Sequence, residues 1–171
     1  GKRLNPLTLT KPKPLLKINE ITLLENTIFL IKKIGIKKII LNTYYLKNQI
    51  ENFLKEKEFN ISIDIVEDGE KILNTGGGIA NMINISEEQD FIIFNPDTIW
   101  NLNYIECIQN MKNYYMEKKI QNILLVVNKK LSFDQRLKGD FMLENNKIKN
   151  NNKANYIYTG CQIINRNLFG F

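Results

Sequence analysis

Two hydrophobic periodicities alternate along this chain from residue 21 to residue 127. Apolar residues recur with helical spacing over residues 21–34, 44–57 and 102–116, and a shorter helix is expected over residues 79–85. Apolar, β-branched runs that predict strands lie between them, at residues 36–42, 61–66, 91–94 and 120–127. This order predicts an α/β fold, in which a mostly parallel sheet carries helices on both faces.

The pattern changes after residue 131. Residues 139–148 predict a β-hairpin with Asn145 and Asn146 at its turn. A polar loop over residues 149–155 leads to another predicted strand, residues 156–164, which contains Gly160. A glycine inside a strand indicates a bulge or a close approach of another backbone.

Composition excludes several classes of protein. The 171 residues include no histidine, which rules out Ser-His-Asp and Cys-His catalysis and histidine-ligated zinc. Cys107 and Cys161 lack metal-ligand spacing, and we expect two buried, reduced thiols in a cytoplasmic protein rather than the alternative, a disulfide. The net charge is +6, but the lysines are dispersed along the chain. No apolar run is long enough for a membrane span, so we expect neither nucleic acid nor membrane as a partner.

The first sixteen residues combine cations with prolines. Pro6, Pro12 and Pro14 each fix φ and remove a backbone donor, so this segment is neither a regular helix nor a central strand. An ordered, irregular segment that holds Arg3 and Lys13 in place would suit a multiply charged anion such as a triphosphate. The alternative interpretation is a proline-rich linker with exposed basic residues.

Glycines and carboxylates supply three further candidates. Gly76, Gly77 and Gly78 follow Thr75 and precede a predicted helix, which favours either a ligand lying on the backbone or a permissive turn. Asp97 follows a predicted strand, where its carboxylate could either bind Mg²⁺ or cap the next turn. Asn95, two residues earlier, could either bind a ligand or end the strand.

Asp140 stands at the start of the predicted hairpin. Its carboxylate could accept hydrogen bonds from sugar hydroxyls, or it could serve the turn alone.

In this order the motifs resemble the sugar-phosphate nucleotidyltransferase family. The matching stretches are Gly-x-Arg-x-x-Pro-Leu-Thr with Pro-Lys-Pro-Leu-Leu (residues 1–16), Asn-Thr-Tyr-Tyr-Leu (42–46), Leu-Asn-Thr-Gly-Gly-Gly-Ile (73–79), Asn-Pro-Asp (95–97), Gly-Asp-Phe (139–141) and Tyr-Thr-Gly with Asn-Leu-Phe (158–169). The branch that the chain is most similar to comprises N-acetylmuramate α-1-phosphate uridylyltransferases and mannose-1-phosphate guanylyltransferase-like proteins. The resemblance implies a Rossmann-like, three-layer α/β/α fold with a hairpin insertion.

The resemblance also implies a role for each candidate residue. Gly1, Lys2 and Arg3 would bind the nucleoside triphosphate, with Arg3 and Lys13 acting on the phosphates during catalysis. Thr75, Gly76 and Gly77 would cradle the nucleotide. The expected Mg²⁺ ligand is Asp97. The residues expected to bind the sugar 1-phosphate are Asn95, Asp140, Thr159 and Gly160.

Three departures from the family pattern qualify these expectations. Pro96 replaces the glycine of Asn-Gly-Asp, and residues 20–22 replace a Gly-Lys-Pro. The family's second metal-binding aspartate has no counterpart here. We therefore expect residues 1–171 to form one nucleotidyltransferase domain that lacks the first strand, its glycine turn and the C-terminal segment, with weak activity by itself.

The expected reaction joins a nucleoside triphosphate, with UTP favoured, to N-acetylmuramate 1-phosphate or a similar hexose 1-phosphate. The first alternative is a mannose-1-phosphate guanylyltransferase. The second is a nucleotide-sugar-binding domain without catalysis. A monomer or a homodimer is expected.

Overall fold

The computed structural model describes the chain except residues 1–3, 70–72, 74, 135, 151–153 and 171. Its strands are β1 (Lys17–Ile18), β2 (Ile21–Thr22), β3 (Lys38–Thr43), β4 (Ser62–Glu67), β5 (Asp90–Phe94), β6 (Asn122–Asn128), β7 (Met142–Glu144), β8 (Lys147–Lys149) and β9 (Tyr156–Asn165). Its α-helices are α1 (Leu7–Thr10), α2 (Leu23–Lys33), α3 (Lys47–Glu56), α4 (Thr75–Asn84) and α5 (Tyr104–Lys118). Short 3₁₀ turns are η2 (Lys13–Leu15), η3 (Lys129–Leu131) and η4 (Arg166–Phe169).

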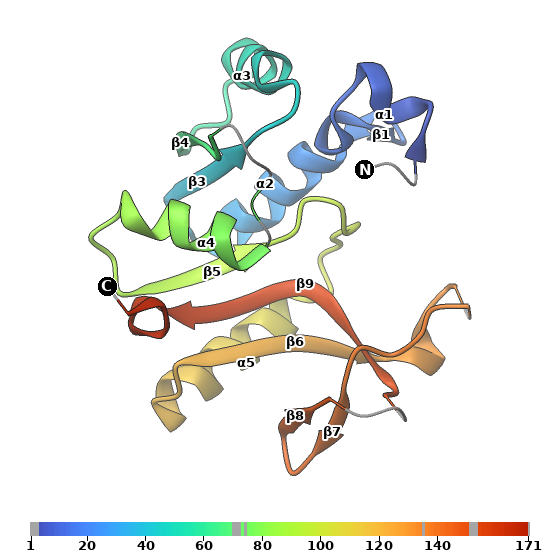
Figure 1. The fold of residues 1–171 in the computed structure, drawn as a ribbon, viewed down its shortest axis with the longest axis vertical. Coiled ribbons are helices and arrows are strands. Elements are labelled where there is room, and N and C mark those ends of the chain that lie inside the picture. The colour runs from blue at the N-terminus through green and yellow to red at the C-terminus, as the bar shows by residue number, and fades with distance from the viewer. Residues whose placement is uncertain (1–3, 70–72, 74, 135, 151–153, 171) are drawn as a thin grey trace.

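The predicted α/β alternation is confirmed, but the last long strand enters the sheet in an unexpected place. β3 and β4 pair in parallel, with Lys38 opposite Ser62 and Thr43 opposite Glu67. β9 lies between β5 and β6 and runs antiparallel to both (Figure 1). The described strands therefore form a parallel pair, β3 and β4, and a three-stranded antiparallel group, β5, β9 and β6, where the periodicity alone predicts one mostly parallel sheet. Local patterns carry no information on strand order.

Alternate side chains of β5 show that helices cover both faces of the sheet. Phe91 and Ile93 pack against Ile79 and Ile83 of α4. The intervening side chains of β5 pack on the other face, against a cluster that includes Leu30 of α2 and residues of α5. The helix α3 joins α2 in a further cluster against β3 and β4. Three layers therefore form, with α4 on one face and α2, α3 and α5 on the other.

The hairpin near the C-terminal end forms as predicted. β7 and β8 pair in register, and the two residues between them, Asn145 and Asn146, have φ values of 50° and 59°. Positive φ at both central residues is what a two-residue hairpin of this twist requires, and asparagine tolerates it better than most residues. The hairpin projects from the end of the sheet in Figure 1.

A capping box fixes the start of α2. The Thr22 hydroxyl accepts from the backbone N–H of Glu25, and the Glu25 carboxylate accepts from the N–H of Thr22. Burial works against the ionised form of Glu25, but hydrogen bonds from Lys57 and Thr22 outweigh it and lower the pKa of this carboxyl. The start of α2 is thereby set at Thr22, immediately after the opening segment.

Removal of this cap should measurably weaken the fold. We expect Thr22→Ala to lower the free energy of unfolding by about 1 kcal/mol, because one backbone donor at the helix start loses its acceptor. Urea denaturation followed by circular dichroism checks this, with the exposed Thr10→Ala as the matched control. Equal midpoints for the two variants would show that the cap contributes nothing.

Candidate active site

Polar residues gather at the carboxyl edge of the sheet, where β3, β4 and β5 end. Asn42 lies near the end of β3, Asp68 directly follows β4, and Asn95 directly follows β5. In open α/β sheets, ligands bind outside this edge. The predicted phosphate-binding and metal-binding residues are therefore expected at this edge.

Lys13 reaches this edge from the opening segment. Pro12 and Leu15 are buried, and the N–H of Leu15 donates to the carbonyl of Pro12 at 2.9 Å, which closes the turn η2. Leu15 packs in the cluster that includes Leu24 and Ile28 of α2. The proline-rich segment is thus an anchored turn rather than a linker, and it carries its lysine at a fixed position.

The ammonium of Lys13 forms an ion pair with the carboxylate of Asp97, which lies 84 positions along the chain. The side chains of Lys13 and Asp97 are 33% and 40% exposed, so a ligand can reach both. The structure therefore brings together two residues that the sequence proposes independently, one for phosphate and one for metal.

A bulge in β9 holds the turn that carries Asp97. Between Leu125 and Val126 of β6 the register with β9 shifts, which leaves Thr159 and Gly160 without a residue opposite them in β6. The Gly160 carbonyl accepts from the N–H of Asn95 at 2.7 Å, and the Thr159 carbonyl accepts from the Thr98 hydroxyl at 2.7 Å. Both predicted alternatives at Gly160, a bulge and a close approach of another backbone, are confirmed, and these contacts position the metal candidate.

Gly160 has no room for a side chain. Its φ is +90°, and a Cβ built there would lie 2.8 Å from the Cβ of Asn95 and 3.1 Å from the hydroxyl of Thr98. The backbone of β9 can therefore approach the turn of Asp97 only because residue 160 is glycine.

The glycines after Thr75 lie inside a helix rather than in a loop before one. α4 begins at Thr75, four residues earlier than predicted. Thr75, Gly76 and Gly77 are exposed in its first turn, whereas Gly78 is buried, and a Cβ on Gly78 would lie 3.0 Å from the Asn42 amide nitrogen. The exposed residues present backbone N–H groups at a helix start, which suits an anion.

A polar cluster that the motifs do not predict lies beside that helix. The Asp68 carboxylate accepts from the amide of Asn42 at 2.8 Å and from the amide of Asn81 in α4 at 3.4 Å. A signal was available, because Asp68 follows β4 much as Asp97 follows β5. These contacts join the ends of β3 and β4 to α4.

Two other predicted substrate-binding residues make internal hydrogen bonds. Asp140 is exposed and accepts from the backbone N–H of Tyr158 at 2.8 Å, as its turn interpretation predicts. The hydroxyl of Thr159 donates to the carbonyl of Leu125 at 2.9 Å. These contacts fix the start of the hairpin and the bulge, and a role in sugar binding stays a prediction.

The structure corrects the prediction of two buried thiols. Cys161 is buried, and burial raises its pKa to about 12, so it is not a nucleophile near neutral pH. Cys107 is exposed on α5, because its position lies on the outer side of a helix that packs through Ile108 and Met111. The remaining predicted site residues, Gly1, Lys2 and Arg3, lie outside the described residues.

Family membership rests on a match over most of the chain. The family model described as nucleotidyl transferase matches residues 1–135. The chain belongs to this family. This match confirms the resemblance to nucleotidyl transferases seen in the motifs, and the matched residues include Lys13, the start of α4 and Asp97.

Curated relatives of this nucleotidyl transferase chain carry names that specify different nucleotide bases and different sugars. The N-acetylmuramate α-1-phosphate uridylyltransferase of Neisseria meningitidis is 30% identical over 110 residues, covering 64% of this chain and 48% of the relative. The mannose-1-phosphate guanylyltransferase of Mycobacterium tuberculosis is 35% identical over 100 residues, covering 58% of this chain and 28% of the relative. The chain thus spans about half, or less, of these relatives' lengths.

Solved structures agree on the fold. The inositol-1-phosphate CTP transferase from T. maritima superposes with a TM-score of 0.80 at 16% identity, covering 99% of this chain and 68% of the other. UDP-glucose pyrophosphorylase from Acinetobacter baumanii gives 0.76 at 18% identity, covering 98% and 72%. The Rossmann-like α/β fold implied by the motifs is therefore confirmed.

Proposed function

We propose that this protein transfers a nucleotidyl group from a nucleoside triphosphate to a sugar 1-phosphate and releases pyrophosphate. The observation that carries the proposal is the Lys13–Asp97 pair at the carboxyl edge of the sheet. The start of α4, with its exposed glycines, lies at the same edge, at the end of β3. One cation, one carboxylate and the N–H groups of a helix start form a set suited to phosphates and their counter-ion.

In the proposed reaction an oxygen of the sugar 1-phosphate attacks the α-phosphorus. The new P–O bond forms as the bond to the bridging oxygen of the β-phosphate breaks, and pyrophosphate leaves with that electron pair. Such a transfer needs positioning and charge neutralisation rather than a protein nucleophile. Lys13 would hold and neutralise the reacting phosphates, which fits a chain without histidine and with a thiol of raised pKa at Cys161.

The donor set at Asp97 fits Mg²⁺. This ion commonly takes one or two carboxylates and completes its shell with water and substrate phosphates. Asp97 is partly exposed and already pairs with a cation, the ammonium of Lys13. Bound there, Mg²⁺ would supply positive charge next to the triphosphate, and Lys13 would leave Asp97 to contact a phosphate.

This exchange of partners predicts the effect of neutralising Asp97. We expect Asp97→Asn to weaken Mg²⁺-dependent nucleotide binding at least tenfold, because the amide keeps the shape but loses the charge. Isothermal titration of the nucleotide with and without Mg²⁺ measures this directly. The matched control is Asp134→Asn, whose aspartate pairs with Arg136 instead. Unchanged Mg²⁺ dependence in Asp97→Asn would remove Asp97 from the metal site.

The remaining site residues complete the proposal. Thr75, Gly76 and Gly77 would contact the nucleotide, and Asn95, Asp140, Thr159 and Gly160 would border the sugar phosphate. Gly1, Lys2 and Arg3 would add to the triphosphate site. The protein would act in the cytoplasm as a monomer or homodimer. Among the helices within the described ranges, none combines the length and apolar character that a membrane crossing needs.

The identity of the base is proposed from the similarity to the uridylyltransferase relative. We favour UTP with N-acetylmuramate 1-phosphate or a similar hexose 1-phosphate. Pyrophosphate release by the complete gene product across UTP, GTP, dTTP and CTP tests this choice. Equal or faster release with GTP and mannose 1-phosphate would favour the guanylyltransferase alternative. Tight nucleotide binding without turnover would favour a domain that only binds.

A further inference from the structure

Asn26 of α2 holds the backbone at the end of the turn that carries Asp97. Its side-chain amide donates from Nδ2 to the carbonyl of Trp100 at 2.8 Å, and its Oδ1 accepts from the N–H of Trp100 at 2.7 Å. One side chain thus satisfies both backbone groups of a residue 74 positions along the chain. Asn26 lies outside the motifs that predict the site.

The side chain of Trp100 is also fixed. It is 2% exposed and packs in the cluster that includes Leu30 of α2. Its ring makes edge-on contacts with the rings of Phe94 and Tyr104, at centroid distances of 5.3 and 4.9 Å. Because its ring is packed and its backbone is bonded, Trp100 forms a firm end for the turn.

Asp97 lies between this end and the bulge in β9. On the side of the bulge, the N–H of Asn95 and the hydroxyl of Thr98 donate to carbonyls of β9. On the other side, Asn26 bonds the backbone of Trp100. Residues 95–100 are therefore held at both ends, and Asn26 supplies the hydrogen bonds to α2.

The first turn of α2 also holds the segment that carries Lys13. The N–H of Leu23, the first residue of α2, donates to the carbonyl of Leu16 at 3.0 Å. Leu15 of η2 is buried and packs in one cluster with Leu24 of α2. The same turn of one helix therefore bears attachments for both the lysine and the carboxylate.

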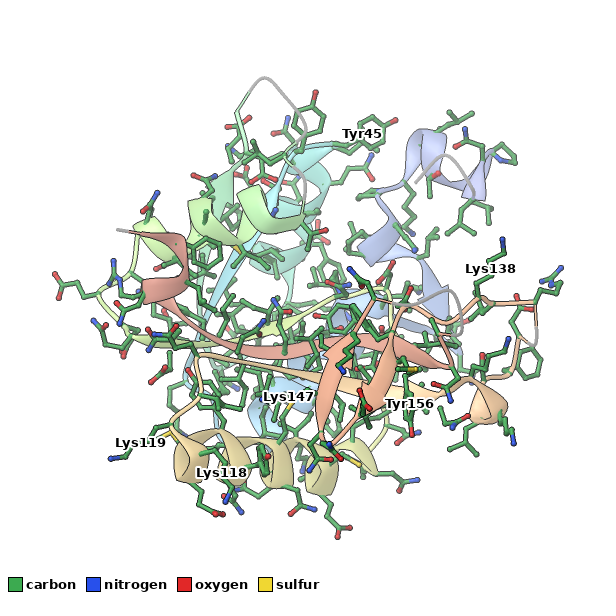
Figure 2. The ribbon with its side chains drawn as sticks, turned by 60° about the horizontal axis from the view of Figure 1, so that its bottom comes forward. Tyr45, Lys118, Lys119, Lys138, Lys147 and Tyr156 are labelled. Carbon is green, nitrogen blue, oxygen red and sulfur yellow. The ribbon has the colours of Figure 1, made fainter. Side chains whose placement is uncertain are left out.

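The earlier part of the opening segment is held by α3 and the residues before it. The hydroxyl of Tyr45 donates to the carbonyl of Leu9 at 2.6 Å, and Tyr45 lies beside α1 in Figure 2. Gln49 of α3 donates to the carbonyl of Thr10 at 2.9 Å. The segment that carries Lys13 is thus held by contacts that do not involve Asn26. Loss of the Asn26 amide should therefore displace Asp97 relative to Lys13.

We propose that Asn26 is a positioning residue for nucleotidyl transfer, which sets Asp97 against Lys13 through the backbone of Trp100. This inference rests on the proposed function, in which Asp97 binds Mg²⁺ and Lys13 contacts a phosphate of the same nucleotide. A metal ligand that is displaced from the lysine no longer fits the same triphosphate. Removal of a residue that orients a metal ligand typically weakens metal binding by about tenfold or more.

Asn26→Leu in the complete gene product tests this role, because leucine has a similar shape but forms neither hydrogen bond. We expect the Mg²⁺ concentration for half-maximal nucleotide binding to rise about tenfold, while nucleotide affinity without Mg²⁺ changes less than about twofold. Isothermal titration measures both quantities. The matched control is Thr22→Ala, which removes the cap of the same helix but leaves the Asn26 amide in place. An equal rise in the two variants would reduce the effect to a loss of helix stability and overturn the proposal.

Amide hydrogen exchange supplies a measurement that needs neither nucleotide nor metal. In Asn26→Leu we expect the amides of residues 95–100 to exchange at least about tenfold faster, while those of β3 and β4 keep their rates. Unchanged exchange over residues 95–100 would overturn the proposal even if activity fell. Faster exchange there, in a protein whose unaltered form binds no nucleotide, would support the role of Asn26 in holding Asp97 and count against the proposed function instead.

Asn26→Asp is the second variant if Asn26→Leu does not fold. Its carboxylate can accept from the N–H of Trp100 but cannot donate to the Trp100 carbonyl. An added carboxylate favours Mg²⁺ by its charge, so a higher Mg²⁺ requirement cannot be an effect of that charge. Unless the Mg²⁺ requirement of Asn26→Asp rises, the proposal is overturned.

Discussion

Lys13→Ala in the complete gene product is expected to reduce turnover at least about a hundredfold while leaving the fold intact. Lys13 is the described cation that pairs with Asp97 at the carboxyl edge, and no described apolar cluster depends on its side chain. Its loss removes charge from the place where the phosphates react. Steady-state pyrophosphate release measures the effect, and circular dichroism checks the fold.

Lys11→Ala is the matched control for this prediction. Lys11 lies two residues away in the same segment and is exposed. Because it is also a lysine, Lys11→Ala changes the net charge by the same amount as Lys13→Ala. We expect nearly normal turnover. Comparable losses in the two variants would indicate a general electrostatic effect and contradict the specific role of Lys13. Near-normal activity of Lys13→Ala would contradict this role more directly.

Gly160→Ala is expected to damage both stability and activity. A Cβ would lie 2.8 Å from that of Asn95, and the residue would be held at a φ of +90°. The conformation costs about 1–2 kcal/mol and the overpacking about 1–3 kcal/mol more. The turn that carries Asp97 must then move, which should raise the Mg²⁺ concentration needed for half-maximal activity. Urea denaturation and Mg²⁺ titration of turnover measure the two effects.

Gly35→Ala separates backbone strain from the clash. Gly35 has a similar φ of +86°, but a Cβ there would meet nothing within 4 Å. We expect it to lose stability by the conformational cost alone and to keep its Mg²⁺ dependence. If both variants show equal stability loss and unchanged Mg²⁺ dependence, the bulge does not position Asp97.

Much of the fold could be predicted because its signals are local. Helical spacing over residues 21–34 and 102–116 marks α2 and α5 to within two residues of their ends. Asparagines at residues 145 and 146 set the hairpin turn, because their conformation is a property of two residues. The bulge at Gly160 could be predicted for the same reason.

The order of strands and the pairing of distant residues could not be predicted in this way. Nothing in the pattern of residues 156–165 says that β9 lies between β5 and β6, because any apolar strand can pair with either neighbour. The contact of Asp68 with Asn42 likewise depends on β3 and β4 lying side by side. Lys13 and Asp97 each belong to a separate motif, and only the fold shows that they meet.

Phosphorus NMR of the complete gene product with Mg²⁺, UTP and N-acetylmuramate 1-phosphate tests the central claim most directly. The proposed chemistry predicts that pyrophosphate and the nucleotide sugar appear together in equal amounts, and that Lys13→Ala slows both at least about a hundredfold. Release of inorganic phosphate without a nucleotide sugar would contradict nucleotidyl transfer. So would the absence of product with every triphosphate and sugar phosphate tried, in a protein that still binds nucleotide.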